Sequence, residues 1–366
     1  MKKYTLTCLP LICTAIVPLC ADSNGNDQQM SDKKMSKKSK GMSQSMREIT
    51  PPAPALATHW ADPFVTAEYI YWKAEETGLQ YAVSGLAPSA TTTTDEHGSI
   101  HDPDFHYDSG FKVGVGLKFK HDGWDLYANY TWLFSDGNGS SVEREDGEES
   151  LQPLYNVAYD GSSTASDMAK AEGDWSLHFN VLDVELGRNF FISPRLTLRP
   201  HFGLKFAWLD QDMQIEYEDA KNFANSSINE LHHHFDEDQF GVGIRTGLNT
   251  AWYMWNKWSI FGNFAATALY SDFDTHRKTE FQNAALGKNT LMHFSYDPHI
   301  ITPVLEFALG LRFETNFSKS DHQFMIQAGW EEQIWFDENQ FTNLTRFSTS
   351  GNLTLQGLTV KAGYAF

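Results

Sequence analysis

The chain has 366 residues, of which 14% are aromatic and 26 are glycine, and its formal net charge is -19. The negative charge argues against nucleic acid as a partner, because binding to phosphates requires basic patches. No run of about 20 apolar residues occurs outside the N-terminus, which excludes a helical membrane protein.

The first 21 residues have the features of a secretory signal peptide. Two lysines precede an apolar run from Leu6 to Leu19, and Ala21 stands before a polar stretch, so we expect cleavage after Ala21. All three cysteines lie within residues 1–21. The mature chain is therefore expected to contain no disulfide, no thiol nucleophile and no cysteine ligand for a metal.

Residues 22–58 form a separate compositional zone. The stretch at 30–46 is rich in Met, Ser and Lys and has no periodicity, and prolines cluster at 51–54. This composition predicts a disordered periplasmic linker that ends in a stiff proline-rich piece. We expect the folded domain to occupy residues 59–366.

In this domain apolar residues recur at every second position, which is the period of a strand with one apolar face. A His-Asp-Gly turn at 121–123 joins two such segments, as expected for a hairpin. The pattern predicts ten strands, at about 65–71, 111–119, 124–132, 174–191, 196–209, 239–252, 258–270, 303–314, 322–335 and 358–366.

The connections between these strands alternate strictly between short turns and long segments. The long connections are polar and irregular and lie at about 74–109, 135–173, 211–238, 272–302 and 337–352. Short periplasmic turns and long outer loops are typical of outer-membrane barrels. We therefore predict an all-β fold, a transmembrane antiparallel up-and-down β-barrel of about ten strands. Twelve to sixteen strands would fit if segments such as 79–83 or 151–159 add strands to the barrel.

Most tryptophans fall at predicted strand ends, and amphipathic rings prefer the membrane–water interface. We assign the following residues to two aromatic girdles: Trp72, Trp124, Trp132, Trp175, Trp208, Trp252, Trp258 and Trp335. The last strand carries Tyr364 and ends at Phe366, a pattern that resembles the assembly signal of outer-membrane barrels. The barrel-assembly machinery is therefore an expected partner.

If the apolar face of each strand meets lipid, the polar face lines the lumen. We predict these pore-lining residues: Glu68, Lys112, Lys118, Asp125, Asp183, Glu185, Arg199, His201, Lys205, Arg245, Glu306, Arg312, Glu331 and Lys361. Acids and bases are nearly balanced, and opposing charges can form a selective constriction. The alternative is a packed network of ion pairs, because about eight strands leave room only for side chains whereas 16–18 strands leave an open channel.

Several segments are similar to a known family. The chain resembles the Legionella-type major-outer-membrane-protein-like family, which also has members in Chlamydia-related bacteria, at 67–82, 123–132, 199–211, 329–341 and 353–366. The resemblance implies a pore-forming barrel in the outer membrane of a Gram-negative-type bacterium. It implies no catalytic residues. Outer-membrane lipid and lipopolysaccharide are expected partners, and the oligomeric state stays open.

These observations lead to two hypotheses on function. The first is a pore that passes small hydrophilic solutes or ions and prefers cations, because acidic loops attract them. The second is a non-conducting surface barrel whose long acidic loops act in adhesion or envelope structure. The number of strands and the packing of the lumen discriminate between them, since a closed lumen leaves only the loops to act.

Signatures of enzymes are absent, including G-x-S-x-G, H-E-x-x-H and a Walker loop, so we predict no enzyme, no catalytic residue and no cofactor. His232, His233 and His234 lie next to Asp236 and Asp238, a composition that can bind a transition metal. However, adjacent side chains of a strand point to opposite faces. We therefore predict no metal site.

Overall fold

The computed structural model describes the chain from Trp60 onward, with gaps between its described segments. These segments are 60–86, 97–120, 122–137, 140–143, 150–155, 168–220, 228–255, 257–283, 287–316, 322–341 and 351–366. The predicted signal peptide (1–21) and linker (22–58) lie outside the described residues, and they stay predictions.

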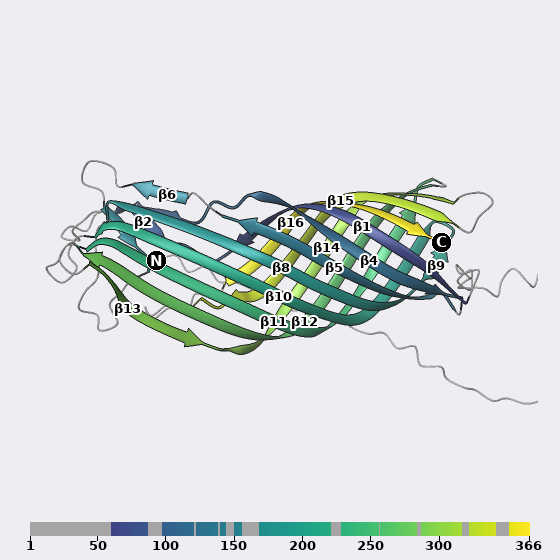
Figure 1. Cartoon of the computed structure of the whole chain (residues 1–366). Coiled ribbons are helices and arrows are strands. Elements are labelled where there is room, and N and C mark those ends of the chain that lie inside the picture. The colour runs from purple at the N-terminus through teal and green to yellow at the C-terminus, as the bar shows by residue number, and fades with distance from the viewer. Residues whose placement is uncertain are drawn as a thin grey trace, which may run out of the picture. The chain divides into compact units, whose positions relative to one another are not determined.

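Ten strands form a closed antiparallel barrel, which confirms the predicted architecture (Figure 1). β1 (Ala61–Glu76) pairs with both β4 and β16, and β8 pairs with β5 and β10, so the ring of strands has no open edge. The other barrel strands are β4 (Tyr107–Phe119), β5 (Trp124–Asp136), β8 (Lys170–Arg188), β10 (Leu196–Ala220), β11 (Ile228–Tyr253), β12 (Trp258–Asn283), β14 (His299–Asn316), β15 (Gln323–Asn339) and β16 (Gly351–Ala365).

Six shorter strands complete the structure. Parts of the two segments that we considered as further barrel strands, 82–83 and 151–153, instead belong to a separate sheet, in which β2 (Ala82–Leu86) pairs with β3 (Ser99–His101) and with β7 (Ser150–Pro153). Residues 156–159 of the second segment lie outside the described residues. The remaining short strands each pair with one barrel strand: β6 (Ser140–Glu143) with β8, β9 (Phe190–Ser193) with β10, and β13 (Gly287–Tyr296) with β12.

Three strands are much longer than predicted, and this corrects two of the expected irregular loops. β10, β11 and β12 have 25 or 26 residues each and include 211–220 and 228–238 of the first expected loop and 272–283 of the second. In Figure 1 they run on beyond β14, β15 and β16, on the side where β2 and β13 lie. We call this part, beyond Trp208 on β10, Phe240 on β11 and Tyr270 on β12, the barrel extension.

The physical reason is that the apolar residues of these strands change from the outer face of the barrel to its inner face. Up to Trp208 of β10 the apolar residues face outward, whereas in the extension Leu209 and Met213 face inward and Asp210 and Asp212 face outward. A strand in lipid needs an apolar outer face, and a strand in water needs an apolar inner face. The polar residues at 211–238 therefore mark the solvent face of strands and not a loop.

Below the extension the outer surface carries a band of exposed apolar side chains. Ile244, Leu309 and Val115 are 71%, 63% and 61% exposed. A water-soluble surface seldom shows such a continuous apolar belt, and a lipid bilayer removes it from water. The described part of the chain holds no helix that is both long enough and apolar enough to cross a bilayer.

Of the eight tryptophans that we assigned to the aromatic girdles, five lie on the outer face of the barrel and three do not, so the assignment is wrong for these three. The five that lie on the outer face are Trp124, Trp132, Trp208, Trp252 and Trp258. Trp72, Trp175 and Trp335 instead point into the barrel and are at most 1% exposed. Each donates its indole N–H to an inward polar oxygen, such as that of Thr359 or Gln211. Strand-end position alone does not distinguish a lipid-facing indole from one that packs in the inverted part of the barrel.

The lipid-facing assignment predicts a cost for a charge in the apolar band. We expect Ile244→Arg to lower the free energy of unfolding by about 2–4 kcal/mol, because a guanidinium near the bilayer midplane must leave water. The control is Asp238→Arg, which places the same side chain on the outer face of the same strand but in the extension. We expect it to lower the free energy of unfolding by much less than Ile244→Arg does. Denaturant unfolding in lipid vesicles, followed by tryptophan fluorescence, measures both. Equal stabilities of the two variants would contradict the lipid assignment.

Candidate functional site in the barrel interior

The structure places all fourteen predicted pore-lining side chains on the inner face of the barrel, in its membrane-spanning part. They come from nine barrel strands, and most are buried or nearly so. Sequence periodicity alone located them, because every second residue of a strand faces the same side. Whether they line a conducting path depends on what fills the space between them.

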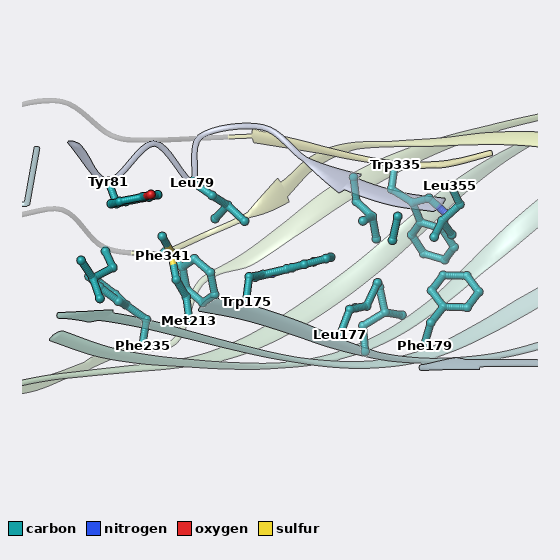
Figure 2. Close-up of a cluster of buried hydrophobic side chains, with 14 of the residues drawn as sticks. Leu79, Tyr81, Trp175, Leu177, Phe179, Met213, Phe235, Trp335, Phe341 and Leu355 are labelled. Carbon is teal, nitrogen blue, oxygen red and sulfur yellow. The ribbon is translucent and has the colours of Figure 1, made fainter. Parts of the chain in front are cut away.

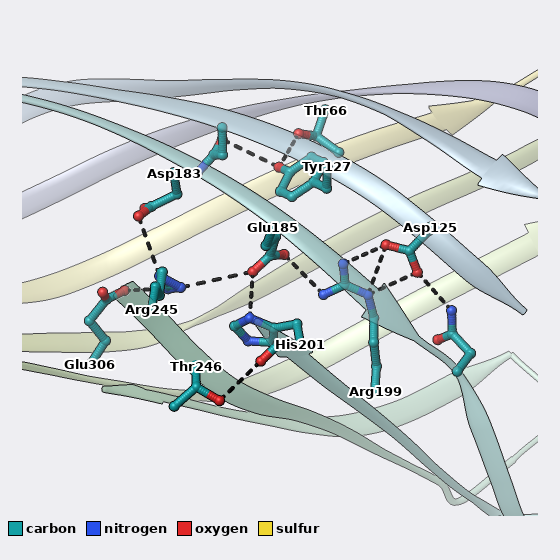
Figure 3. Close-up of polar contacts among 12 residues, drawn as sticks. Thr66, Asp125, Tyr127, Asp183, Glu185, Arg199, His201, Arg245, Thr246 and Glu306 are labelled. Atoms are coloured by element: carbon teal, nitrogen blue, oxygen red, sulfur yellow. Dashed lines mark hydrogen bonds and ion pairs between the residues drawn. The ribbon is translucent and has the colours of Figure 1, made fainter. Parts of the chain in front are cut away.

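At the end of the barrel with the short turns, Arg199 bridges two carboxylates (Figure 3). Its Nη2 lies 2.5 Å from Asp125 Oδ1, and its Nη1 lies 2.9 Å from Glu185 Oε1. His201 Nδ1 is 2.8 Å from the other oxygen of Glu185. Both carboxylates are therefore neutralised by side chains, which is how a buried charge avoids its cost of desolvation.

A second ion-pair group lies in the middle of the barrel and joins opposite walls. Lys205 Nζ is 2.9 Å from Asp183 Oδ1 and 3.0 Å from Glu306 Oε1. Arg245 contacts the same two acids, with its Nη2 2.6 Å from Glu306 Oε2 and its Nε 3.3 Å from Asp183 Oδ1. Lys205 is only 1% exposed, so this group leaves little water around its charges.

The remaining predicted residues are also paired. Lys112 Nζ is 2.5 Å from Glu331 Oε1, and Lys361 Nζ is 2.8 Å from Glu68 Oε1. Lys118 donates to the amide oxygen of Gln323 at 3.1 Å, and Arg312 Nε donates to that of Gln327 at the same distance. The balance of acids and bases in the sequence thus corresponds to direct pairing, between neighbouring strands for Glu68 and Lys361 and between strands that are not neighbours for Lys112 and Glu331.

Two cavities with charged residues in their walls lie between these groups, toward the short-turn end. The larger has a volume of about 310 Å³ and reaches residues at the strand ends such as Tyr253 and Tyr364. The smaller has a volume of about 120 Å³ and is lined by Asp183, Arg245 and Glu306 of the middle ion-pair group. Both are lined by Tyr127, Glu185 and Lys361, so they are neighbours. In an outer-membrane barrel this end faces the periplasm.

Beyond the middle ion pairs the interior is an apolar core, which continues into the extension (Figure 2). Trp335 packs edge-to-face on Phe179 at 5.4 Å between ring centroids, and both are at most 1% exposed. Farther out, Phe235 lies 5.1 Å from the ring of Tyr155 and 5.6 Å from that of Phe341. These described side chains fill the interior between the cavities and the long-connection end.

Part of this core comes from the connections and not from the barrel strands. We call these residues the loop cap: Leu79, Tyr81, Leu151, Tyr155 and Phe341. The hydroxyl of Tyr217 in β10 donates to the backbone oxygen of Tyr81 at 2.6 Å, which fixes the cap to the barrel wall. The prediction of long polar outer loops gave no sign that their apolar residues fold into the barrel.

Sequence reasoning also missed three carboxylates buried in the core, Glu76, Glu237 and Glu338. They are at most 2% exposed. Glu237 Oε2 accepts from the backbone N–H of Gln340 at 2.8 Å, and Glu338 Oε2 accepts from Gln239 Nε2 at 3.2 Å. All three lie in regions that we expected to be irregular loops, so their inward direction was not visible in the sequence.

The burial of these three carboxyl groups changes their acidity. Burial raises the pKa of Glu338 to about 8. Burial together with repulsion among the three also places the pKa values of Glu76 and Glu237 well above the ordinary value for glutamate. The other charged group that acts on them is Asp238, which repels Glu237. A proton is thus the means by which these side chains avoid an unpaired buried charge.

The three adjacent histidines divide between the two faces, as expected for a strand. His233 points inward, is 1% exposed, and has Nδ1 within 3.0 Å of Thr279 Oγ1. Burial and the nearby Arg277 guanidinium lower the pKa of His233 well below its usual range. His232 and His234 point outward from the extension toward carboxylates.

Comparison with known proteins gives one family and several structures of similar fold. Residues 52–366 match the family described as Legionella pneumophila major outer membrane protein precursor. No curated protein matches the chain. The similar solved structures described below share at most 12% of their residues with this chain, so the likeness concerns the fold alone.

The outer membrane protease OmpT from Escherichia coli is 9% identical, with a TM-score of 0.39 over 83% of this chain and 96% of that one. A major outer membrane protein from Thermus thermophilus is 12% identical, with a TM-score of 0.31 over 84% of this chain and 100% of that one. The toluene transporter TodX from Pseudomonas putida is 10% identical, with a TM-score of 0.34 over 86% of this chain and 92% of that one.

Proposed function

Because this chain belongs to the Legionella pneumophila major outer membrane protein family and is an outer-membrane β-barrel, we propose that it acts as a surface barrel with a closed lumen. Its working part is the barrel extension, which presents an acidic face to the outside of the cell and binds basic partners in adhesion or envelope structure. The barrel carries out no enzymatic reaction.

The length and inverted polarity of the extension carry this proposal. A strand needs about 9–11 residues to cross a bilayer, and β10, β11 and β12 have 25 or 26. The excess residues build a projecting β-structure with an apolar inside and a charged outside, like a domain in water. A simple pore does not need such a structure, whereas a surface-binding protein does.

The outward face of the extension carries acidic residues close to one another, and their mutual repulsion lowers the stability of the folded protein. Asp210, Asp238 and Asp274 lie directly opposite one another across β10, β11 and β12. Like charges in cross-strand pairs are destabilising. Burial, and then repulsion by Asp210 and Asp274, raises the pKa of Asp238. A basic partner would relieve this repulsion, and the acidic field would speed its approach.

A pore remains the second candidate, and the cavities favour it. They leave open space in the membrane-spanning part, with charged side chains of both signs on the wall. To conduct, the barrel would have to move the loop cap and also the Trp335–Phe179 contact, because both close the lumen. The small width left between the ion pairs would then limit passage to small solutes and ions, with cations favoured by the acidic exterior.

One experiment with two readouts separates the candidates. We expect the refolded chain to stay silent in single-channel recordings in a planar bilayer. We also expect bacteria that display the wild-type barrel to adhere to a basic surface, such as immobilised polylysine, and to lose most of this adhesion in the triple variant Asp210→Asn, Asp238→Asn, Asp274→Asn. Raising the salt concentration should weaken wild-type adhesion, because the attraction is between exposed charges.

The matched control removes outward acids from the other side of the barrel, in Glu75→Gln, Glu332→Gln. This variant should adhere like the wild type. Discrete conductance steps from the wild-type chain would favour the pore over the closed surface barrel. Equal adhesion of the triple variant and the wild type would sink the acidic-face proposal, since all these changes lie on outward side chains and leave the core intact.

A further inference from the structure

The outward face of the extension carries a histidine between two carboxylates. His234 Nε2 lies 3.1 Å from Asp236 Oδ1 and 3.5 Å from Asp212 Oδ2. Asp212 of β10 and Asp236 of β11 are direct cross-strand partners, and His234 stands two positions from Asp236 on the same face of β11. The ladder hydrogen bonds between the two strands therefore fix the backbone positions of all three residues relative to one another.

The distances match those between ligands of one tetrahedral metal ion. Zinc bonds to imidazole nitrogen and carboxylate oxygen are about 2.0–2.1 Å long, which separates two ligand atoms at a tetrahedral centre by about 3.3–3.4 Å. The two distances from His234 Nε2, 3.1 and 3.5 Å, bracket this value. One ligand atom from each residue lies within 4.8 Å of the others, so small side-chain movements suffice to close the site.

We propose that Asp212, His234 and Asp236 bind a divalent transition-metal ion of the zinc type on the outer face of the barrel. The imidazole supplies one nitrogen and the two carboxylates supply one oxygen each, and the fourth position stays open to water or to an anionic group from outside. Asp212 and Asp236 face each other across β10 and β11, and their negative charges repel. A bound cation would turn this repulsion into attraction of both carboxylates to the metal ion.

The neighbouring groups separate this site from a general acidic surface. In the group of His232, Glu216 lies 3.6 Å from Nδ1 whereas Glu230 lies 3.5 Å from Nε2, so the two acids contact opposite nitrogens of the ring. One ligand atom from each of these three residues also lies within 4.8 Å of the others, but gathering both acids on a single ring nitrogen requires one carboxylate to leave the nitrogen that it contacts. Lys278, opposite His234 on β12, pairs with Glu280 at 2.9 Å, which turns its charge away from the proposed ion.

The test is zinc binding to the refolded, tag-free full-length chain, measured by calorimetry. We expect His234→Ala and Asp212→Asn each to weaken the affinity of the tightest zinc site by more than about 100-fold. Loss of a residue that only supports a metal ligand costs about 10–100-fold in affinity, so a larger loss indicates a ligand. The matched control is His299→Ala, an outward histidine that pairs with Asp272 alone at 2.7 Å and belongs to no three-ligand group among the described residues. It should bind zinc like the wild type.

A second readout reports coordination directly. Cobalt(II) in place of zinc should give the visible absorption of a tetrahedral site in the wild type and in His299→Ala, and should lose it in His234→Ala. All of these residues are partly exposed and outward, so the variants keep the barrel, which heat-modifiable mobility in gel electrophoresis verifies. Absence of zinc binding by the wild type, or its loss in His232→Ala and not in His234→Ala, would overturn the assignment.

Discussion

A Lys205→Met variant is expected to lose about 3–5 kcal/mol of unfolding free energy, the usual result of removing one partner of a buried ion pair. The ammonium group lies within 3.0 Å of oxygens of both Asp183 and Glu306 and is 1% exposed. Without it Arg245 alone must balance two carboxylates in the middle of the barrel. Methionine fills nearly the same volume, so the loss reflects charge and not a cavity.

The control is Lys170→Met, which removes an equally well-paired but accessible lysine. Its Nζ is 2.8 Å from Glu172 and 3.2 Å from Glu218, with a side chain that is 28% exposed. Exposed pairs contribute about 0–1 kcal/mol. Denaturant unfolding in lipid vesicles compares the two, and adding Glu306→Gln to Lys205→Met should restore part of the loss. If both lysine variants lost less than about 1 kcal/mol, water would screen the middle of the lumen, and the closed-barrel proposal would fail.

A Glu338→Gln variant is expected to make the barrel more stable than the wild type at alkaline pH and equally stable near pH 5. The pKa of Glu338 is about 8 in the folded protein, against an ordinary value of 4.5. A raised pKa means that the folded state prefers the protonated form. Its contribution to stability is therefore greatest below pH 4.5 and is lost as the pH rises to about 8.

The size of this effect follows from the shift. Each pKa unit corresponds to about 1.4 kcal/mol, so the upper bound at pH 9 is about 5 kcal/mol, with ionisation of Glu76 and Glu237 adding in the same direction. Glutamine keeps the shape and cannot ionise. Thermal unfolding of the wild type and the variant between pH 5 and pH 9 measures it. A profile for Glu338→Gln that runs parallel to that of the wild type would show that Glu338 is not buried in the core.

The sequence predicted the barrel well because the relevant signals are local. Alternation on β4 and β5, with the turn at 121–123 between them, predicts a hairpin whatever the rest of the chain does. Ten such segments with alternating short and long connections leave few other topologies. The same period placed Lys205 and Glu306 on the inner face, although the strands that carry them are far apart in the chain.

Our predictions from the sequence failed in places where the polarity of the residues, and not their periodicity, distinguished a strand from a loop or the outer face from the inner face. At Leu209 the apolar set of β10 moves from even to odd positions, and the outward residues from Asp210 onward become polar. We interpreted this polar stretch as a loop, although it is the wet face of a strand. Trp175 and Trp335 were misassigned for the same reason, because an indole at a strand end suits either a lipid interface or an apolar interior.

By itself, the sequence predicted about ten barrel strands, their order and the inward direction of the fourteen lumen side chains, since period, turns and connection lengths depend on near neighbours. Only the tertiary structure decided what the inner face does. Lys205 meets Glu306, and Trp335 meets Phe179, across the barrel from strands that are not neighbours in the sheet. Whether inward side chains meet or leave a channel depends on the radius at which the sheet closes and on the connections that fold inside it. No stretch of sequence contains either quantity.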